Sequence, residues 1–169
     1  MKKENITSTQ KGVIAEHIVA NELMIQTNGR FSPFSPLADD GGTDLLIYDK
    51  KTGKALPIQI KSRTGGIIKK GKESNTIHFE IRSVSLKNEK YAYFLAVLLG
   101  KDIRSVKRAW LIPIKDISAL LNMRKKQSKY VMRANKSLNA KDKFRRYQCE
   151  NMIEVTKRIE KILENEINV

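Results

Sequence analysis

Two runs of sequence decide the fold: Gly42-Thr43-Asp44-Leu45-Leu46-Ile47-Tyr48 and Leu56-Pro57-Ile58-Gln59-Ile60-Lys61-Ser62-Arg63. Both are short and mainly apolar or β-favouring, which is typical of strands. The segment between them is polar and contains Thr52-Gly53, a pair that can reverse the chain direction. The two runs therefore predict a β-hairpin.

The turn residues set the register of this hairpin. If Thr52-Gly53 occupies the two turn positions, the pairing places Asp44 opposite Lys61 and Leu46 opposite Gln59. Register matters because it decides which polar side chains meet across the strands.

The alternation of side chains along a strand separates a core face from a polar face. We expect Ile58 and Ile60 to enter the core, whereas Gln59 and Lys61 share the face on which Asp44 begins. A carboxylate, an amide oxygen and an ammonium group then converge at one end of the hairpin. Such a set is suited to a metal ion, a water molecule and a phosphate group.

Residues 8–27 are predicted to form a helix, capped by Ser8 or Thr9 and stopped by Asn28-Gly29. Its apolar residues lie nearly all round, which predicts a largely buried helix. Glu16 falls inside the broadest apolar arc. A buried carboxylate needs a cation or a proton, so we favour a functional Glu16 over one turned to solvent. The arc contains Val13, Ala15, Val19, Ala20, Leu23 and Met24.

The rest of the chain predicts a loop over 29–43, strands over 76–82, 91–99 and 109–114, a short helix over 115–123 and a long helix from Asn139. Asp142 is expected near the positive end of that last helix. The order indicates an α+β class of fold, with a mixed sheet of about five strands flanked by helices. We expect one domain over 1–169, with a core of about 8–115 and a basic helical part of about 116–169. The expected core stripe of the last helix is Phe144, Tyr147, Met152, Val155, Ile159 and Ile162.

The composition is strongly basic. The 169 residues include 33 Lys and Arg against 18 Asp and Glu, a formal net charge of +15. This excess predicts a polyanionic partner, with nucleic acid ahead of an anionic membrane surface. A single cysteine, Cys149, excludes an intrachain disulfide and fits a reducing compartment. Because no apolar run reaches the length of a membrane span and the N-terminus has no signal-type core, we expect a soluble cytoplasmic protein.

The positive charge is concentrated between Lys101 and Arg146, where fifteen basic residues face three acidic ones. A field this strong favours a nucleic-acid backbone as its partner. Tyr130 lies inside this run, where packing is a more common role than stacking on a base. The loop after the hairpin resembles a phosphate-cradling loop, but Glu73 stands where Ser or Thr should hold magnesium, so we reject a nucleotide site. The candidate nucleic-acid-binding residues are Ser62, Arg63, Lys69, Lys70, Lys72, Arg124, Lys125, Lys126, Lys129 and Arg133.

Taken together, Glu16, Asp44 and Gln59-Ile60-Lys61 resemble the signature of the PD-(D/E)xK nuclease superfamily. That signature is a helix glutamate, an aspartate that opens a strand, and a (D/E/Q)-x-K in the next strand. The run Gln59 to Arg63 is similar to the corresponding run of archaeal Holliday junction resolvases, and glutamine at its first position is frequent in Mrr-like restriction nucleases. The resemblance covers about residues 8–115.

The resemblance implies a restriction-endonuclease-like core and a metal-dependent endonuclease that cuts DNA, on either branched or duplex substrates. It implies that Glu16, Asp44, Gln59 and Lys61 are catalytic, and that Mg²⁺ or Mn²⁺ is held by Asp44, Gln59, the Ile60 carbonyl and Glu16. Lys61 would orient the attacking water or stabilise the transition state. A homodimer is implied as well, because cutting two strands asks for two sites.

Two positions depart from the signature. Thr43 precedes Asp44 where proline is usual, and Gln59 replaces a carboxylate. The second change removes a negative charge from the metal site, and Asp39, Asp40 or Glu80 could compensate, although we expect Glu80 to pair with an arginine on the strand surface. The departures leave two alternatives open: a DNA-binding relative that has lost cleavage, and a basic RNA-associated protein.

Overall fold

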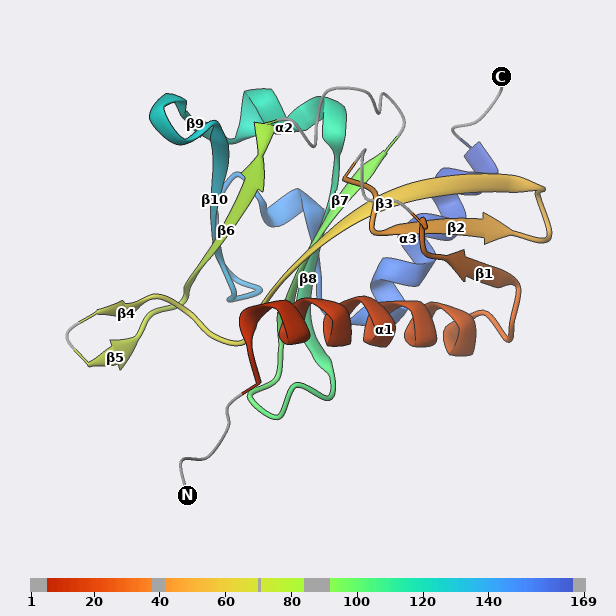
Figure 1. Cartoon of the computed structure of the whole chain (residues 1–169), viewed down its shortest axis with the longest axis horizontal. Coiled ribbons are helices and arrows are strands. Elements are labelled where there is room, and N and C mark those ends of the chain that lie inside the picture. Colours follow the sequence, from red (N-terminus) through yellow and green to blue (C-terminus); the bar gives the residue numbers. More distant parts are fainter. Residues whose placement is uncertain (1–5, 38–41, 70, 84–91, 166–169) are drawn as a thin grey trace.

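The protein is described by a computed structural model that covers residues 6–37, 42–69, 71–83 and 92–165. Within these residues the fold is a mixed α+β structure with a six-stranded main sheet flanked by helices, which confirms the predicted fold class (Figure 1). The β3–β7 pair is parallel, and the other neighbouring pairs are antiparallel. In order, the strands of the sheet are β1 (Phe31–Phe34), β2 (Leu45–Asp49), β3 (Lys54–Arg63), β7 (Tyr93–Leu99), β8 (Val106–Pro113) and β11 (Gln148–Cys149).

A second sheet lies beside the main one, in the order β6 (Thr76–Arg82), β10 (Lys129–Asn135) and β9 (Asn122–Arg124). A two-stranded ribbon, β4 (Ile68–Lys69) and β5 (Lys72–Glu73), projects from the body between β3 and β6 (Figure 1). Three α-helices complete the description: α1 (Ser8–Gln26), α2 (Ile114–Leu120) and α3 (Met152–Asn165). Short 3₁₀ turns span Lys125–Gln127 and Arg145–Tyr147.

Two apolar cores form on the two faces of the main sheet. The first contains Ile58 and Ile60 of β3 together with buried residues of α1 and α3, which confirms the predicted inward face of the hairpin. The second contains Phe94 of β7 and buried residues of β6, β10 and α2. Helices therefore cover one face of the main sheet, and the small sheet with α2 covers the other. Tyr130 packs against the second core, as expected.

Helix α1 begins where a reciprocal pair of hydrogen bonds caps it. Thr7 Oγ1 accepts from the Gln10 backbone N–H, and the Thr7 N–H donates to Gln10 Oε1. The predicted caps, Ser8 and Thr9, were therefore wrong by one or two residues. The helix ends before Asn28, whose φ is 49°, and Gly29, as predicted.

The prediction that α1 is largely buried is wrong. Only a narrow stripe of Ala15, Val19 and Leu23 is fully buried, because α1 has partners on one side only, where it contacts β3, β1 and α3. Val13 and Met24, which lie in the predicted apolar arc, are exposed. A sequence that is apolar nearly all round thus forms a half-exposed helix.

The hairpin pairs two residues away from the predicted register. Leu46 lies opposite Pro57 and Asp49 opposite Lys54, so the turn has four residues, with Gly53 at a φ of 71°. The register was predicted from a two-residue turn, which is why it was wrong. A shift of two residues keeps every side chain on its expected face, since the side-chain period of a strand is two.

The predicted loop over 29–43 contains an edge strand, β1, which pairs with β2. Pro33 lies within it, and an edge strand tolerates proline because one side of the strand makes no ladder hydrogen bonds. Strand β8, next to the edge strand β11, ends at Pro113 as expected. The short helix predicted over 115–123 is confirmed as α2, although it ends earlier, at Leu120.

The expected basic helical part over 116–169 needs a larger correction. Residues 129–135 form β10, which pairs with β6 over seven residues. The last helix begins at Met152, not at Asn139. Asp142 instead closes a turn, where its side-chain oxygens accept from the backbone N–H groups of Asn135 (2.7 Å) and Phe144 (3.0 Å). Strand pairing with a distant segment decided this region, and local helix signals did not.

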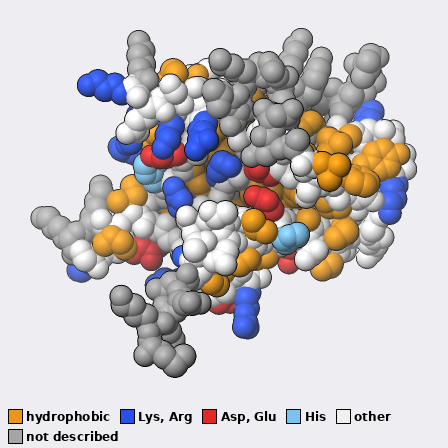
Figure 2. All heavy atoms as spheres, viewed as in Figure 1, with side chains coloured by type: hydrophobic (Ala, Val, Ile, Leu, Met, Phe, Trp, Pro, Cys, Tyr) orange, Lys and Arg blue, Asp and Glu red, His pale blue; other side chains and the backbone are white. Residues whose placement is uncertain are grey.

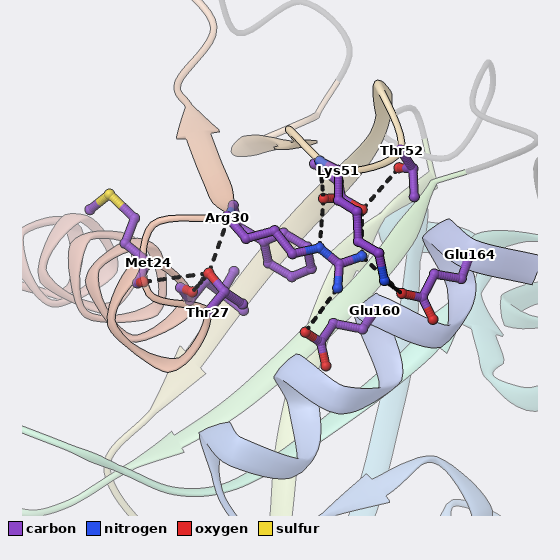
Figure 3. Close-up of polar contacts among 10 residues, drawn as sticks. Met24, Thr27, Arg30, Lys51, Thr52, Glu160 and Glu164 are labelled. Atoms are coloured by element: carbon purple, nitrogen blue, oxygen red, sulfur yellow. Dashed lines mark hydrogen bonds and ion pairs between the residues drawn. The ribbon is translucent and has the colours of Figure 1, made fainter.

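One buried ion cluster fixes the turn end of the hairpin (Figure 3). Arg30 binds the fully buried Asp49 through two hydrogen bonds of 2.8 and 2.7 Å. The same guanidinium reaches Glu160 (3.3 Å) and Glu164 (3.1 Å) on α3. Since Asp49 also accepts from Thr52 Oγ1, Arg30 and Asp49 together connect the segment after α1 with the hairpin turn and α3.

Candidate active site

A polar cleft of about 420 Å³ opens at the end of the hairpin that lies away from its turn. It lies between β3 of the main sheet and β6 and β10 of the small sheet, because residues of all three strands line it. The parallel pairing sets Gln59 beside Phe94 and Lys61 beside Ala96, two residues of the second core, so both polar residues face the small sheet. The lining residues are Gly42, Asp44, Gln59, Lys61, Arg63, Glu80, Arg82 and Lys129.

Three of the four predicted catalytic residues meet in this cleft. Asp44 precedes β2, and its Oδ2 accepts from the Ile60 backbone N–H at 2.5 Å. The Lys61 ammonium lies 3.9 Å from the same oxygen. Asp44 is therefore held across the hairpin by the strand that carries Gln59 and Lys61, which differs from an aspartate that only caps the preceding turn.

Gln59 is the most unusual member of the cleft. Its residue surface is only 3 % exposed, so it is not the surface amide that an accidental match would give. Its Oε1 is buried and has no hydrogen-bond partner among the described residues. A buried carbonyl oxygen without a donor costs about 1–3 kcal/mol, and native structures keep such groups where a ligand, ion or water meets them.

Glu16, the fourth predicted catalytic residue, lies on α1. It is half-buried on α1, next to Ala15 of the buried stripe, and α1 packs against the face of β3 that carries Ile58 and Ile60. Gln59 and Lys61 point to the opposite face, and Glu16 is not among the described residues that line the cleft. The cleft lining thus includes three of the four predicted groups, and the role of Glu16 stays a prediction.

Glu80 contributes a second carboxylate to the cleft. It extends from β6 and pairs with Lys129 at 3.0 Å and Arg124 at 3.6 Å, and its Oε1 lies 3.7 Å from His78 Nε2. The expected pairing with an arginine is thus confirmed, and a lysine joins it. The hydrogen bond from Lys129 is the main cause that holds the pKa of the Glu80 carboxyl below its ordinary value. The other acids considered as replacements, Asp39 and Asp40, lie outside the described residues.

His78 lies beside this ion cluster, but its imidazole has a lowered pKa. Its Nε2 is buried without a hydrogen-bond partner in the described part of the chain, and burial is the main cause that lowers its pKa. The imidazole therefore adds little positive charge near Glu80 at neutral pH.

Basic side chains gather over the small sheet, with acidic ones among them (Figure 2). Of the predicted nucleic-acid-binding residues, Arg63 and Lys129 line the cleft. Arg124 and Arg133 line a neighbouring hollow of about 280 Å³ together with Lys143. Ser62 is half-buried at the end of β3, and Lys126 is exposed.

The ribbon carries the remaining predicted lysines. Lys72 is exposed on β5, and Lys69 is its backbone partner on β4. The base of the ribbon is tightly fixed, because a Cβ at Gly66 would lie 2.0 Å from the Ser74 carbonyl oxygen. Lys70 falls outside the described residues, and the side chain of Lys125 is not described.

Arg82 and Gly42 also line the cleft, and neither was predicted from the sequence. Arg82 follows Glu80 at a spacing of two on the alternating strand β6, so both share a face. That alternation was visible in the sequence. The sequence did not show that β6 folds back over β3, and this fold turns the face of β6 with Glu80 and Arg82 toward Asp44.

A metal ion in this cleft would need oxygen atoms beyond carboxylates. Within the described ranges, no group of three or more His, Cys, Asp and Glu side chains is arranged to hold a metal ion. The available donors are the Asp44 carboxylate, the partnerless Gln59 Oε1 and backbone carbonyls, which are hard ligands of the kind that Mg²⁺ and Mn²⁺ accept. The donor set fits such an ion without requiring a three-carboxylate cluster.

Comparison with known proteins adds a fold relationship. No protein-family model matches the chain, and no curated protein matches it. None of the helices in the described ranges has the length and apolar character that a membrane crossing needs. Among solved structures, the chain is similar to that of a bacterial homing endonuclease, I-Ssp6803I, with a TM-score of 0.59 and 15 % identity over 94 % of this chain and 92 % of that one. The chain thus shares its fold with a homing endonuclease over nearly the whole length of both.

Proposed function

We propose that this protein is a metal-dependent endonuclease that hydrolyses phosphodiester bonds of DNA in the cleft between β3 and β6. The observation that carries the proposal is the partnerless oxygen of Gln59, buried beside Asp44 and Lys61 in a cleft with a basic rim. The fold shared with a homing endonuclease and the net charge of +15 support the same proposal.

The metal ion would be Mg²⁺ or Mn²⁺, held by Asp44, by Gln59 Oε1 and by the Ile60 carbonyl. The Ile60 N–H already points to Asp44, and the N–H and C=O of one strand residue point to the same side. The Ile60 carbonyl therefore faces the segment that carries Asp44, directly before β2. When bound, such an ion neutralises phosphate charge and lowers the pKa of a bound water.

Lys61 would orient the attacking water or donate to the phosphate as negative charge develops. Its distance of 3.9 Å from Asp44 Oδ2 is too long for a hydrogen bond, so its ammonium hydrogens are available to a substrate. Arg63, Arg82 and Lys129 at the rim would hold neighbouring phosphates. Glu16, on α1, is proposed as an outer contributor to the site.

The finer assignment follows from the same residues. We propose membership of the PD-(D/E)xK superfamily, in its Gln-x-Lys form, with one nuclease-like domain over 1–169. The support for one domain is that both cores combine residues from before and after residue 115. Branched DNA and duplex DNA both remain candidate substrates, and a homodimer would supply one site for each strand of a duplex.

The proposal is tested by cleavage of plasmid and four-way-junction DNA in the presence of Mg²⁺ or Mn²⁺. Asp44→Asn and Lys61→Ala should each lower the cleavage rate at least about 100-fold, because each removes charge stabilisation in the site. Both variants should still bind DNA in a chelating buffer. Lys51→Ala, which removes an exposed lysine at the other end of the hairpin, is the matched control and should cut normally.

One alternative has a specific observation in its favour. Gln59 stands where a carboxylate would bind a metal more strongly, so the chain could be a DNA-binding protein that no longer cuts. Binding without cleavage by the wild-type protein with either metal ion would establish that alternative. Restored cutting by Gln59→Glu would then show that the missing charge was the cause. A preference for structured RNA over every DNA tested would contradict both proposals.

A further inference from the structure

The two basic residues nearest to Glu80 are already occupied in the free protein. Lys129 Nζ lies 3.0 Å from Glu80 Oε2, and Arg124 Nη1 lies 3.6 Å from Glu80 Oε1. Strand pairing sets this arrangement, because Lys129 pairs with both Arg82 on β6 and Arg124 on β9. A single carboxylate with two oxygens thus bridges two cations from different strands.

Lys129 and Arg124 are arranged as an anion-binding site, and the Glu80 carboxylate is the anion that fills it. A phosphate presents two oxygens to a lysine and an arginine in much the same way as a carboxylate does. Glu80 is partly accessible, with a side chain 28 % exposed, and it lines the same cleft as Asp44 and Lys61. A phosphate that entered the cleft would therefore compete with Glu80 for the same two cations.

We propose that Lys129 and Arg124 form a second phosphate site, which Glu80 occupies as an internal counter-ion until a DNA phosphate displaces it. The proposal rests on DNA binding in the cleft, as given under the proposed function, and adds to it a non-scissile phosphate next to the cutting site. Glu80 then weakens the grip on DNA, and its displacement frees a carboxylate within the cleft.

If Glu80 had a structural or catalytic role, its removal would weaken DNA binding or leave the affinity unchanged. The proposal predicts the opposite change in affinity. Removing the Glu80 charge should tighten DNA binding, because the ion pairs of Lys129 and Arg124 with Glu80 no longer have to be broken first. The slope of log affinity against log salt should change little, since the same phosphate contacts form in the wild type once Glu80 has been displaced.

The experiment measures the affinity for a DNA duplex in a chelating buffer over a series of salt concentrations, so that cleavage plays no part. Glu80→Gln should bind about tenfold more tightly than wild type, with a similar dependence on salt. Lys129→Gln should bind more weakly with a shallower slope. The Glu80→Gln gain should be largely lost in the Glu80→Gln/Lys129→Gln double variant, because Lys129 is the cation that Glu80 releases.

Glu73→Gln is the matched control. Glu73 also bridges two cations, Lys136 at 2.7 Å and Lys101 at 3.9 Å, but it is not among the residues that line the cleft. Both variants change the net charge equally, so any general effect of charge appears in both. Thermal unfolding of each variant checks that the fold is kept.

Three results would overturn the inference: equal gains for Glu80→Gln and Glu73→Gln, a gain that persists without Lys129, or weaker binding by Glu80→Gln. The outcome is separable from that of the proposed function. A wild-type protein that binds DNA and never cuts would contradict the nuclease while leaving the Glu80 result intact. A protein that cuts, but gains no affinity from Glu80→Gln, would contradict only the second phosphate site.

Discussion

The two ends of the β2–β3 hairpin treat buried polar groups in opposite ways. At the turn end, Asp49 is fully buried, and Arg30, Thr52 and the Lys51 backbone N–H all donate to its oxygens (Figure 3). At the open end, Gln59 is nearly as buried, yet its oxygen has no partner among the described residues. The same two strands therefore carry a satisfied cluster and an unsatisfied one.

We interpret the difference between the paired Asp49 and the unpaired Gln59 as a division between a stabilising end and a functional end of the hairpin. A fully paired buried carboxylate stabilises the fold only as long as every partner is present. Substitutions at the turn end should therefore lower the free energy of unfolding without changing DNA cleavage. An unpaired buried oxygen lowers stability, and its retention beside Asp44 and Lys61 is explained by a ligand that would complete it. The experiments below test this contrast.

The largest effect on stability is expected from Arg30→Ala. The variant leaves the buried Asp49 charge without its bidentate partner, and breaking such a pair lowers the free energy of unfolding by about 3–5 kcal/mol. Chemical denaturation measures this loss, and DNA cleavage by the protein that remains folded should be unchanged. The double variant Arg30→Met/Asp49→Leu should regain much of the stability, because it removes both charges together. A loss below about 1 kcal/mol for Arg30→Ala would show that the cluster is not structural.

The next largest effect is acid destabilisation. Arg30, first, and then the Lys51 N–H and the Thr52 hydroxyl hold the pKa of Asp49 at about 2, against burial, which raises it. Because this pKa is lower in the folded protein, the stabilisation is present above the unfolded value of about 4 and is lost as the pH falls toward 2. We expect a decrease of about 2 kcal/mol in the free energy of unfolding over that interval. In the Arg30→Met/Asp49→Leu variant this part of the pH dependence should disappear.

A smaller effect of opposite sign is expected at the open end. Gln59→Leu removes the unpaired oxygen, so the free energy of unfolding should stay level or rise by about 1 kcal/mol, while Mg²⁺ or Mn²⁺ binding measured by calorimetry should be lost. The matched control is Gln148→Leu. Gln148 is equally buried, but its amide Nε2 donates to the Asn135 carbonyl at 3.1 Å, so its loss should destabilise the protein. Equal destabilisation by the two variants would contradict the contrast between the hairpin ends.

The smallest effect should come from the exposed edge of the turn-end cluster. Lys51 pairs with Glu164 at 3.0 Å, but the Lys51 side chain is 65 % exposed, and solvent and salt screen such pairs. Lys51→Ala should change the free energy of unfolding by less than about 1 kcal/mol in thermal or chemical unfolding. A change as large as that of Arg30→Ala would mean that exposure does not distinguish the two cations.

The sequence predicted the faces of the hairpin better than its register. Ile58 and Ile60 are buried and Gln59 and Lys61 meet Asp44, although the strands pair two residues away from the expected alignment. The reason is that a four-residue turn replaced a two-residue one, and a shift of two leaves the alternation unchanged. The burial of Glu16 was predicted less well: the residue is half-buried, because the face of a helix that meets a sheet depends on which side of that sheet is free.

The C-terminal third shows where local signals were insufficient. Asn139 and Asp142 have the chemistry of helix caps, yet they lie in turns, and residues 129–135 pair as a strand with β6. Strand formation there depends on a partner more than 40 positions earlier in the sequence, which no local pattern reports. The same pairing brings Lys129 and Arg124 to Glu80.

By itself, the sequence determined the strongly positive charge, the hairpin with its alternating faces, and the residue types that could bind a metal ion and a phosphate. These are properties of composition and of a period of two, and both are local. Only the tertiary structure decided that β6 and β10 fold over β3 to form the cleft, and that Glu80 meets two cations. Such arrangements depend on contacts between distant segments, because packing two sheets against each other is settled by the whole chain and not by any one stretch of it.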